Sequence, residues 1–433
     1  MQAREQWGSH LGFIIACIGS AVGIGNIWRF PYIVGTNGGG AFLVPYVIIT
    51  VCFGLAFMIL EFAVGRRYQT SIITSLAQIK KKFRWAGIFT VLVAFAILSY
   101  YLVILGWVIA FLFLMITQSS ADFDEFTNSL YPVFTFLVIL AINYVVIRKG
   151  VTGGIERLNK IGILLLVAML VPLAIFGMLL PGSEKGLEFY LTPDFSKLSE
   201  ADIWSTAFGQ VFFSLSLGTG ILLAYGSYMR GTHSLVKSSA IIIVSNAMVS
   251  FVAGLMIFSI VFAFGMNPEE GVALVFQVMP SIFSEMEFGM MIGATFFFLL
   301  LIAGLTSSVS IFQVPVSALE DTFGYSKSKS VLIITLLVLA VGLPSALSYS
   351  SVELTVFGEA FLDLMDSFFG IYGIAISAVI FVVLVTWFMN KKELLNQVNV
   401  GQKIRIPEWI VSVVKFVLPA LIIASLLFTF LGI

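Results

Sequence analysis

The sequence predicts an all-α integral membrane protein with eleven transmembrane helices, arranged as an inverted 5+5 repeat with discontinuous helices 1 and 6 plus one extra helix. Three observations lead to this fold class. The 433-residue chain is 59% hydrophobic and 11% charged, whereas an average soluble protein carries about 25% charged residues. Eleven segments are long and apolar enough to cross a bilayer, which takes about 20 residues of helix. Two of these segments contain glycines and polar residues at mid-depth.

The eleven apolar segments follow one another without a long linker, so residues 1–433 are expected to form a single transmembrane domain. They cover residues 9–34, 40–67, 86–118, 131–148, 157–181, 202–229, 236–265, 289–319, 329–345, 359–389 and 407–432. The first five-helix repeat is residues 1–181, the second is 202–390, and helix 11 is 407–433. The first segment is too long and too polar at its end for a cleaved signal peptide, and is expected to stay in the mature protein.

Lysine and arginine are distributed unevenly between alternate loops. With a cytoplasmic N-terminus, 19 of the 23 cations fall on the cytoplasmic side, while the outer loops collect acidic residues. The positive-inside rule therefore predicts a multi-pass plasma-membrane protein with its C-terminus outside the cell. No Asn-x-Ser/Thr sequence occurs, which is more typical of a prokaryotic protein than of a glycosylated animal protein.

Several functional classes are excluded by composition. The net charge is zero and no basic, aromatic-rich stretch occurs, so nucleic acid is not an expected partner. Cys17 and Cys52 both lie in apolar runs and indicate no disulfide framework. No nucleophile with an adjacent base and no metal cluster supports an enzyme. Membrane lipid is the expected surrounding partner.

Glycine clusters interrupt the first and sixth segments, which read GSAVGIGNIWRFP and FFSLSLGTGILLAYGSY. Close packing of small residues between helices is one explanation, and Gly19 with Gly23 fits it. The accompanying polar residues, such as Asn26 and Thr219, favour unwound backbone that lines a cavity. The breaks occupy matching places in two five-helix blocks, and because five is odd the second block is inverted. Paired broken helices of this kind indicate a transporter's midplane site. Their free carbonyls can bind a cation and their free amides a carboxylate.

Four ordered motifs make the chain resemble the neurotransmitter:sodium symporter family, in particular its prokaryotic eleven-helix amino-acid transporters with the leucine-transporter fold. The motifs are REQWGSHLGFIIACIGSAVGIGNIWRFPY, NGGGAFLVPY, SLSLGTG and AGLTSS. The match covers nearly the whole chain, although most relatives add a twelfth helix. The resemblance implies sodium-coupled import of amino acids by alternating access.

The resemblance also implies two sodium sites made of oxygen atoms, which hard cations prefer. Sodium site 1 would use Ala21, Asn26, Ser214 and Asn246 together with the substrate carboxylate. Sodium site 2 would use the carbonyls of Gly19, Val22 and Ala303 and the hydroxyls of Thr306 and Ser307. The alternative for these two hydroxyls is a hydrogen bond to the preceding helical turn. The shared carboxylate would make ion and substrate binding reciprocal.

The implied substrate site is mostly apolar and carries no charge. Its residues would be Ala21, Gly23, Gly25, Ile97, Tyr101, Phe213, Ser214, Ser216, Gly218, Thr219, Ser307 and Ile311. Tyr101 and the amides near Gly23 would bind the carboxylate, although an interfacial position is the alternative for Tyr101. Monoamine-carrying relatives have an aspartate where this chain has Gly23. An unpaired charge in such a pocket is costly, so neutral, hydrophobic amino acids are the expected substrates.

A charge argument extends the resemblance to chloride. Two sodium ions and a zwitterion bring two positive charges into a site of low dielectric constant. Many bacterial relatives have a carboxylate one turn after the position of Asn246, where this chain has Ser250. The chloride ligands of chloride-dependent relatives correspond to Tyr46, Gln210, Ser214, Asn246 and Ser250. Chloride is therefore the expected counter-ion, with another anion or a proton as the alternative.

Two gates are implied by the same resemblance. The outer gate would pair Arg29 with Asp366 through water beneath a Phe213 lid, with Asp363 as a second candidate partner. The inner gate would use Arg4, Asp321, Ser227, Tyr228 and Trp7. The alternative for Arg4 is a positive-inside anchor. Gly162 and Pro172 have a spacing that some relatives use to unwind helix 5, and whether it does so here stays open.

Two alternative functions remain open at this level. One is an amino-acid sensor or receptor that keeps the site without transport, and the other is an ion channel. A channel is disfavoured because side chains close both ends and no repeated filter strand occurs. The sequence leaves open which amino acid is preferred, the sodium stoichiometry, and whether the protein is a monomer or a homodimer.

Overall fold

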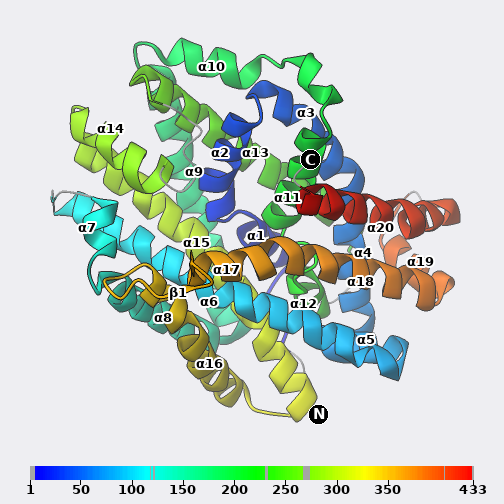
Figure 1. The fold of residues 1–433 in the computed structure, drawn as a ribbon. Helices are drawn as coiled ribbons and strands as arrows, with labels where there is room; N and C mark the ends of the chain where they lie inside the picture. The colour runs from blue at the N-terminus through cyan, green and yellow to red at the C-terminus, as the bar shows by residue number, and fades with distance from the viewer. Residues whose placement is uncertain are drawn as a thin grey trace.

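The computed structural model describes residues 5–117, 119, 122–229, 233–266, 274–403 and 405–431. These residues are almost entirely helical, and the long helices cross one another in one bundle with α1 near its middle (Figure 1). Nine helices of the described part are long and apolar enough to cross a membrane, or ten if one bent pair counts as a single span.

The first half of the chain forms helices close to the predicted segments, with short π-helical or 3-10 turns (η) between or within them. The elements are α1 (His10–Ala21), η1 (Gly25–Arg29), α2 (Phe30–Thr36), α3 (Gly40–Ile49), η2 (Thr50–Gly54), α4 (Leu55–Tyr68), α5 (Ile72–Ile79), η3 (Lys81–Phe83), α6 (Arg84–Ile116), α7 (Phe123–Thr127), α8 (Tyr131–Arg148), η4 (Val151–Glu156), α9 (Arg157–Met178), α10 (Ser183–Leu191) and η5 (Phe195–Ser199). Helix α9 is continuous through Gly162 and Pro172. The fifth helix is therefore wound in this structure.

The second half follows the same pattern and adds one two-stranded antiparallel hairpin. Its elements are α11 (Ala201–Ser214), α12 (Ile221–Ser227), α13 (Leu235–Ala263), η6 (Leu274–Val278), α14 (Met279–Glu285), α15 (Gly289–Phe323), α16 (Lys327–Ser348), β1 (Thr355–Val356), β2 (Glu359–Ala360), α17 (Phe361–Met365), η7 (Asp366–Gly373), α18 (Ile374–Phe388), α19 (Lys391–Asn399) and α20 (Glu408–Leu431). The predicted sixth segment is thus two helices, α11 and α12, on either side of residues 215–220.

Close helix crossings at glycine hold the broken segments in the core. Helix α12 packs against α4, where a Cβ atom on Gly65 would lie 2.1 Å from the carbonyl oxygen of Leu223. Helix α1 packs against α9, α13 and α15, and the long helices α6 and α15 pack against each other. Because each broken segment touches several unbroken helices, its free backbone groups are shielded from lipid.

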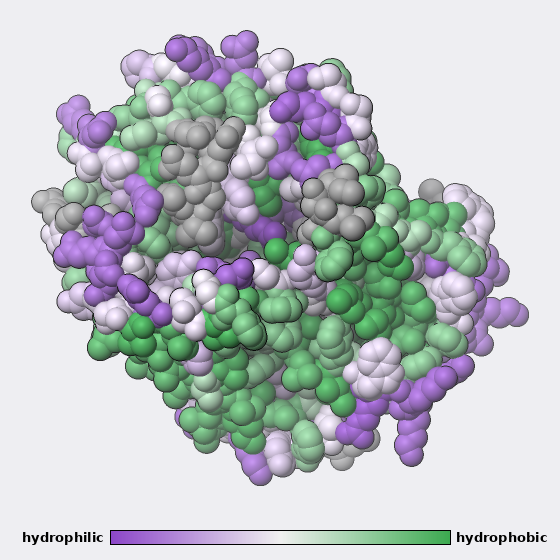
Figure 2. All heavy atoms as spheres, viewed as in Figure 1, coloured by the Kyte–Doolittle hydropathy of each residue, from purple (hydrophilic) through white to green (hydrophobic). Residues whose placement is uncertain are grey.

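Large apolar side chains cover much of the outer surface. Figure 2 shows a broad hydrophobic area between two regions rich in hydrophilic residues. Leu164 on α9 is 71% exposed and Phe134 on α8 is 63% exposed. Apolar patches of this extent are expected to face lipid in a chain with this many spanning helices.

Candidate functional site

The first helical segment is broken where the sequence predicts. Helix α1 ends at Ala21, Val22 is extended (φ −80°, ψ 94°), and the two halves of the segment are bent by 51°. The side chain of Asn26 replaces a helical partner, because its Oδ1 accepts a hydrogen bond from the backbone amide of Gly23 (3.0 Å). The break therefore depends on Asn26 as well as on glycine.

The second break turns through left-handed backbone. Gly218 and Gly220 have φ values of 75° and 78°, which glycine adopts without strain, and Ser216 has a φ of 55°. A non-glycine residue in this region is uncommon, and Ser216 is held there by two contacts. Its carbonyl accepts from the Thr219 hydroxyl (2.7 Å), and its own hydroxyl donates to the carbonyl of Ser20 (3.0 Å). This last bond joins the two breaks directly.

A cavity of about 40 Å³ lies between the two breaks. It is lined by eleven of the twelve predicted substrate residues, together with four further residues: Ser20, Asn26, Ile221 and Ile374. Gly218 is the exception. Its carbonyl accepts from Ser377 Oγ (2.7 Å), and a Cβ there would lie 2.9 Å from that of Ala378. Gly218 therefore shapes the backbone and does not line the cavity.

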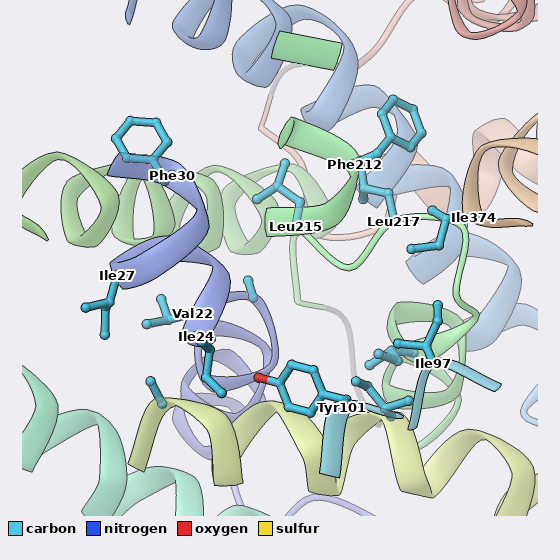
Figure 3. Packing of buried hydrophobic residues seen from close by; sticks show 14 of the residues in the cluster. Val22, Ile24, Ile27, Phe30, Ile97, Tyr101, Phe212, Leu215, Leu217 and Ile374 are labelled. Carbon is cyan, nitrogen blue, oxygen red and sulfur yellow. The ribbon is translucent and has the colours of Figure 1, made fainter. Parts of the chain in front are cut away.

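Polar atoms surround Gly23 at the floor of the cavity. A Cβ on Gly23 would lie 2.6 Å from Ser307 Oγ and 3.3 Å from the Tyr101 hydroxyl oxygen. Figure 3 shows the Tyr101 hydroxyl pointing toward the unwound stretch at Ile24. This hydroxyl is buried and makes no hydrogen bond to another described residue. A carboxylate is one group that could accept its proton in a hydrogen bond.

A connected amide and hydroxyl network lies beside the cavity. Asn26 Nδ2 contacts Ser214 Oγ (3.1 Å), Asn246 Oδ1 (2.9 Å) and Ser250 Oγ (2.7 Å). Asn246 Nδ2 also donates to Ser214 Oγ (2.8 Å). All four side chains are buried. Two amide hydrogens on Asn26 cannot serve three acceptors at once, so this set has oxygen lone pairs available for a cation.

Unpartnered donors lie next to this network. The Tyr46 hydroxyl and both polar atoms of the Gln210 side chain are buried without a hydrogen-bond partner among the described residues. Tyr46 is a neighbour of Ser214 and Ser250, and Gln210 precedes Ser214 by one turn of α11. Buried donors normally have acceptors. The residues predicted to bind chloride therefore lie together, and their donor chemistry fits an anion.

The residues of the predicted second sodium site also lie together. Ser307 Oγ on α15 contacts the carbonyl oxygens of Gly19 (3.3 Å) and Val22 (3.4 Å). Thr306 Oγ1 instead donates to its preceding turn, with the Ala303 carbonyl 2.9 Å away. The Thr306 hydroxyl thus forms the hydrogen bond to the preceding turn that was the alternative, although its oxygen still has lone pairs for an ion. A hydroxyl group can donate its hydrogen to the preceding turn and coordinate a cation through an oxygen lone pair at the same time.

The predicted outer gate residues line a vestibule of about 230 Å³ above the cavity, and Phe213 lines both spaces. No direct ion pair joins Arg29 to Asp366 within the described part. Asp366 Oδ1 accepts from the Tyr100 hydroxyl (2.6 Å), and the Arg29 guanidinium lies 4.5 Å from the centre of the Phe213 ring. Pairing of Arg29 with Asp366 through water stays a prediction.

Asp363 has its own partner at the mouth of the vestibule. Its Oδ2 accepts from the Tyr349 hydroxyl (3.0 Å). Burial, together with the nearby Asp363 carboxylate, raises the pKa of Tyr349 above its usual range. Tyr349 therefore stays protonated and donates to Asp363, as Tyr100 donates to Asp366.

At the opposite end, Arg4 lies outside the described residues. Asp321 accepts a hydrogen bond from the backbone amide of Ser71. Trp7 Nε1 donates to the Tyr225 carbonyl (2.9 Å). Tyr228 accepts from Gln313 Nε2 (2.7 Å), and Ser227 donates to the carbonyl of Ala224. Trp7 thus contacts α12 close to its C-terminal end, and its role in an inner gate stays a prediction.

Two further acidic residues at this end, Glu5 and Glu156, escaped the sequence analysis. Glu5 forms an ion pair with Lys327 (2.7 Å) and accepts from the amide of Val151 (3.1 Å). Glu156, which is buried, accepts from the amide of Gly8 (2.8 Å). These bonds fasten the N-terminal segment to η4 and α16. Lys327, the first residue of α16, carries no sequence signal beyond the charge count.

Glu61 is the third residue that the sequence analysis missed. It lies on α4, fully buried, and its carboxylate faces the backbone of Gly218 and Gly220. Neither oxygen makes a hydrogen bond to a described side chain. A lone carboxylate inside an apolar segment is rare and functional as a rule, so its position in the second segment was the available signal.

Comparisons with known proteins agree with this geometry. The model of the Sodium:neurotransmitter symporter family matches residues 4–131 and 120–433. An uncharacterized sodium-dependent transporter of Methanocaldococcus jannaschii is 35% identical, over 94% of this chain and 86% of its own. A sodium-dependent serotonin transporter of Drosophila melanogaster is 28% identical, over 89% of this chain and 69% of its own. The crystal structure of MhsT in complex with L-phenylalanine superposes with a TM-score of 0.89 at 34% identity, over 98% of this chain and 99% of that chain.

Proposed function

The chain belongs to the sodium:neurotransmitter symporter family, and from this membership we propose that it imports neutral, hydrophobic amino acids together with sodium by alternating access. Its relatives are sodium-dependent transporters and not enzymes. The observation that carries the proposal is the small cavity between the two breaks, with the Tyr101 hydroxyl directed at it and no charged residue in its lining. The similar structure of MhsT holds L-phenylalanine, an amino acid of the proposed class.

The direct test of this proposal is uptake into proteoliposomes. Purified protein should accumulate radiolabelled L-phenylalanine or L-leucine when sodium is outside, and should not do so when choline replaces sodium. Each net positive charge moved inward across 100 mV contributes about 2.3 kcal/mol, so an inside-negative potential should raise the accumulation further. Sodium-dependent binding without accumulation would indicate a sensor, and unitary currents would indicate a channel.

We also propose that chloride is the counter-ion of the loaded site. Support comes from the buried donors of Tyr46 and Gln210, from Ser250 in place of a carboxylate, and from the sodium- and chloride-dependent transporters among the relatives. Chloride would bind to Tyr46, Gln210, Ser214, Asn246 and Ser250. Its charge would offset part of the charge of two sodium ions in a medium where uncompensated charge is costly.

Replacing chloride by gluconate is expected to lower sodium-driven uptake at least tenfold in the unaltered protein. The variant Ser250→Glu should keep its uptake in gluconate, because a fixed carboxylate supplies the missing negative charge. The measurement is initial uptake rate at saturating sodium in each anion. Equal rates of the unaltered protein in chloride and gluconate would overturn chloride dependence, while leaving sodium symport intact.

The remaining architecture is proposed on the same basis. Helices α11 and α12 would form one broken span, which completes eleven. Residues 1–181 and 202–390 would form the inverted repeats, and α20 would be the extra helix. The charge distribution supports a cytoplasmic N-terminus. The Glu5–Lys327 pair would then lie on the cytoplasmic side, where it would join the inner gate.

A further inference from the structure

One buried oxygen near the second sodium site has no partner. Asn159 lies on α9 with its side chain fully buried. Its Nδ2 donates to the carbonyl of Ile155 in the preceding turn (2.8 Å), while its Oδ1 makes no hydrogen bond to any described residue. The bond to Ile155 fixes the orientation of the amide, since the reverse orientation would set two oxygens against each other. A buried acceptor without a partner is unfavourable.

This oxygen reaches α1 at one residue of the proposed sodium site. A Cβ on Gly19 would lie 1.7 Å from Asn159 Oδ1 and 3.2 Å from the Cβ of Thr306. One turn further along α9, a Cβ on Gly162 would lie 2.9 Å from Thr306 Cγ2. Asn159 and Gly162 therefore face the same junction of α1 and α15 that contains Gly19, Thr306 and Ser307.

Asn143 is a buried asparagine with a purely structural role, and it provides a comparison for Asn159. Asn143 on α8 is equally buried, and its Nδ2 also donates one turn back, to Ile139 (3.0 Å). Its Oδ1, however, accepts from the hydroxyl of Ser308 (2.9 Å). Both Nδ2 and Oδ1 of Asn143 thus have hydrogen-bond partners within the protein. The Oδ1 of Asn159, beside the proposed sodium site, has none among the described residues.

We propose that Asn159 Oδ1 is an additional ligand of the second sodium site. An amide carbonyl is a neutral oxygen donor of the type that hard cations prefer. It would join the carbonyls of Gly19, Val22 and Ala303 and the hydroxyls of Thr306 and Ser307. The inference rests on the proposed function, because it requires that sodium binds there. The competing explanation is a weak Cα–H···O contact with Gly19 that holds the two helices together.

The test is a sodium titration of the purified full-length protein. Binding of radioactive sodium and sodium-dependent thermal stabilisation are measured without substrate for the unaltered protein, Asn159→Ala and the matched control Asn143→Ala. The half-saturating sodium concentration of Asn159→Ala should rise at least fivefold, and that of Asn143→Ala should stay within twofold.

A second variant covers the case in which alanine prevents folding. Asn159→Asp keeps the shape and places a carboxylate oxygen at the same position, so its half-saturating sodium concentration should fall at least threefold. Unchanged sodium affinity in Asn159→Ala, or in Asn159→Asp where alanine does not fold, would overturn the inference. An unaltered protein that shows no sodium response would instead overturn the proposed function.

Discussion

The substitution Asn26→Ala is expected to lower sodium-dependent substrate affinity at least 100-fold. Asn26 holds the first break through the amide of Gly23 and contacts Ser214, Asn246 and Ser250. Alanine would leave several of these buried groups unpaired, at about 1–3 kcal/mol each, and a loss of about 3 kcal/mol corresponds to roughly 100-fold. The variant would also lose a proposed ligand of the first sodium ion.

The measurement is equilibrium binding of the amino acid as a function of sodium concentration. Asn37→Ala is the control, because Asn37 lies at the end of the same broken segment. Among the described residues its side chain donates only to the nearby Ile33 carbonyl and Thr36 hydroxyl. We expect its affinity within about twofold of the unaltered protein. If Asn26→Ala were monodisperse and bound substrate with unaltered sodium dependence, the network would have only a packing role.

The positions of both breaks could be predicted because their signals are local. Glycine and polar residues inside apolar segments are incompatible with an ordinary lipid-facing helix, so Gly23, Asn26 and Gly218 mark the breaks without any tertiary information. The resemblance then supplied nearly all of the cavity lining. Gly218, which the resemblance places among the substrate residues, does not line the cavity in this structure. The sequence alone does not show which side of a turn faces the cavity.

Other features could not be predicted because they depend on contacts between distant segments. The ion pair of Glu5 with Lys327 joins residues that are 322 positions apart in the chain. The bond from Tyr100 to Asp366 and the spare oxygen of Asn159 depend on side-chain orientation on α6 and α9. Helical periodicity assigns such residues to a face. It does not give the partner on the facing helix.

Glu61→Ala is the second substitution with a large expected effect, a loss of uptake of at least 100-fold. At the second break the backbone amides of Gly218 and Gly220 have no backbone hydrogen-bond partner among the described residues, and the buried Glu61 carboxyl group faces them. Water and lipid cannot replace it in a fully buried position, so removing it leaves polar backbone unsatisfied at a cost of several kcal/mol. Gly220 then loses its fixed left-handed geometry, and the Thr219 and Ser216 side chains lose their place in the cavity.

The variant Glu61→Gln keeps the shape of the side chain and one acceptor oxygen but removes the acidic group. Glutamine keeps one acceptor oxygen at nearly the same position, so we expect folded protein with uptake reduced only about tenfold, because one of the two carboxyl oxygens is replaced by a donor group. Uptake and hydrogen exchange of residues 215–220 are the two measurements, and exposed Glu125→Gln serves as the control for loss of a carboxylate. Faster exchange in Glu61→Ala than in Glu61→Gln is expected, because the acceptor oxygen is what orders the break. Uptake by Glu61→Ala at the unaltered rate would mean that the glycines hold the turn by themselves, and the buried carboxylate would then need a different explanation.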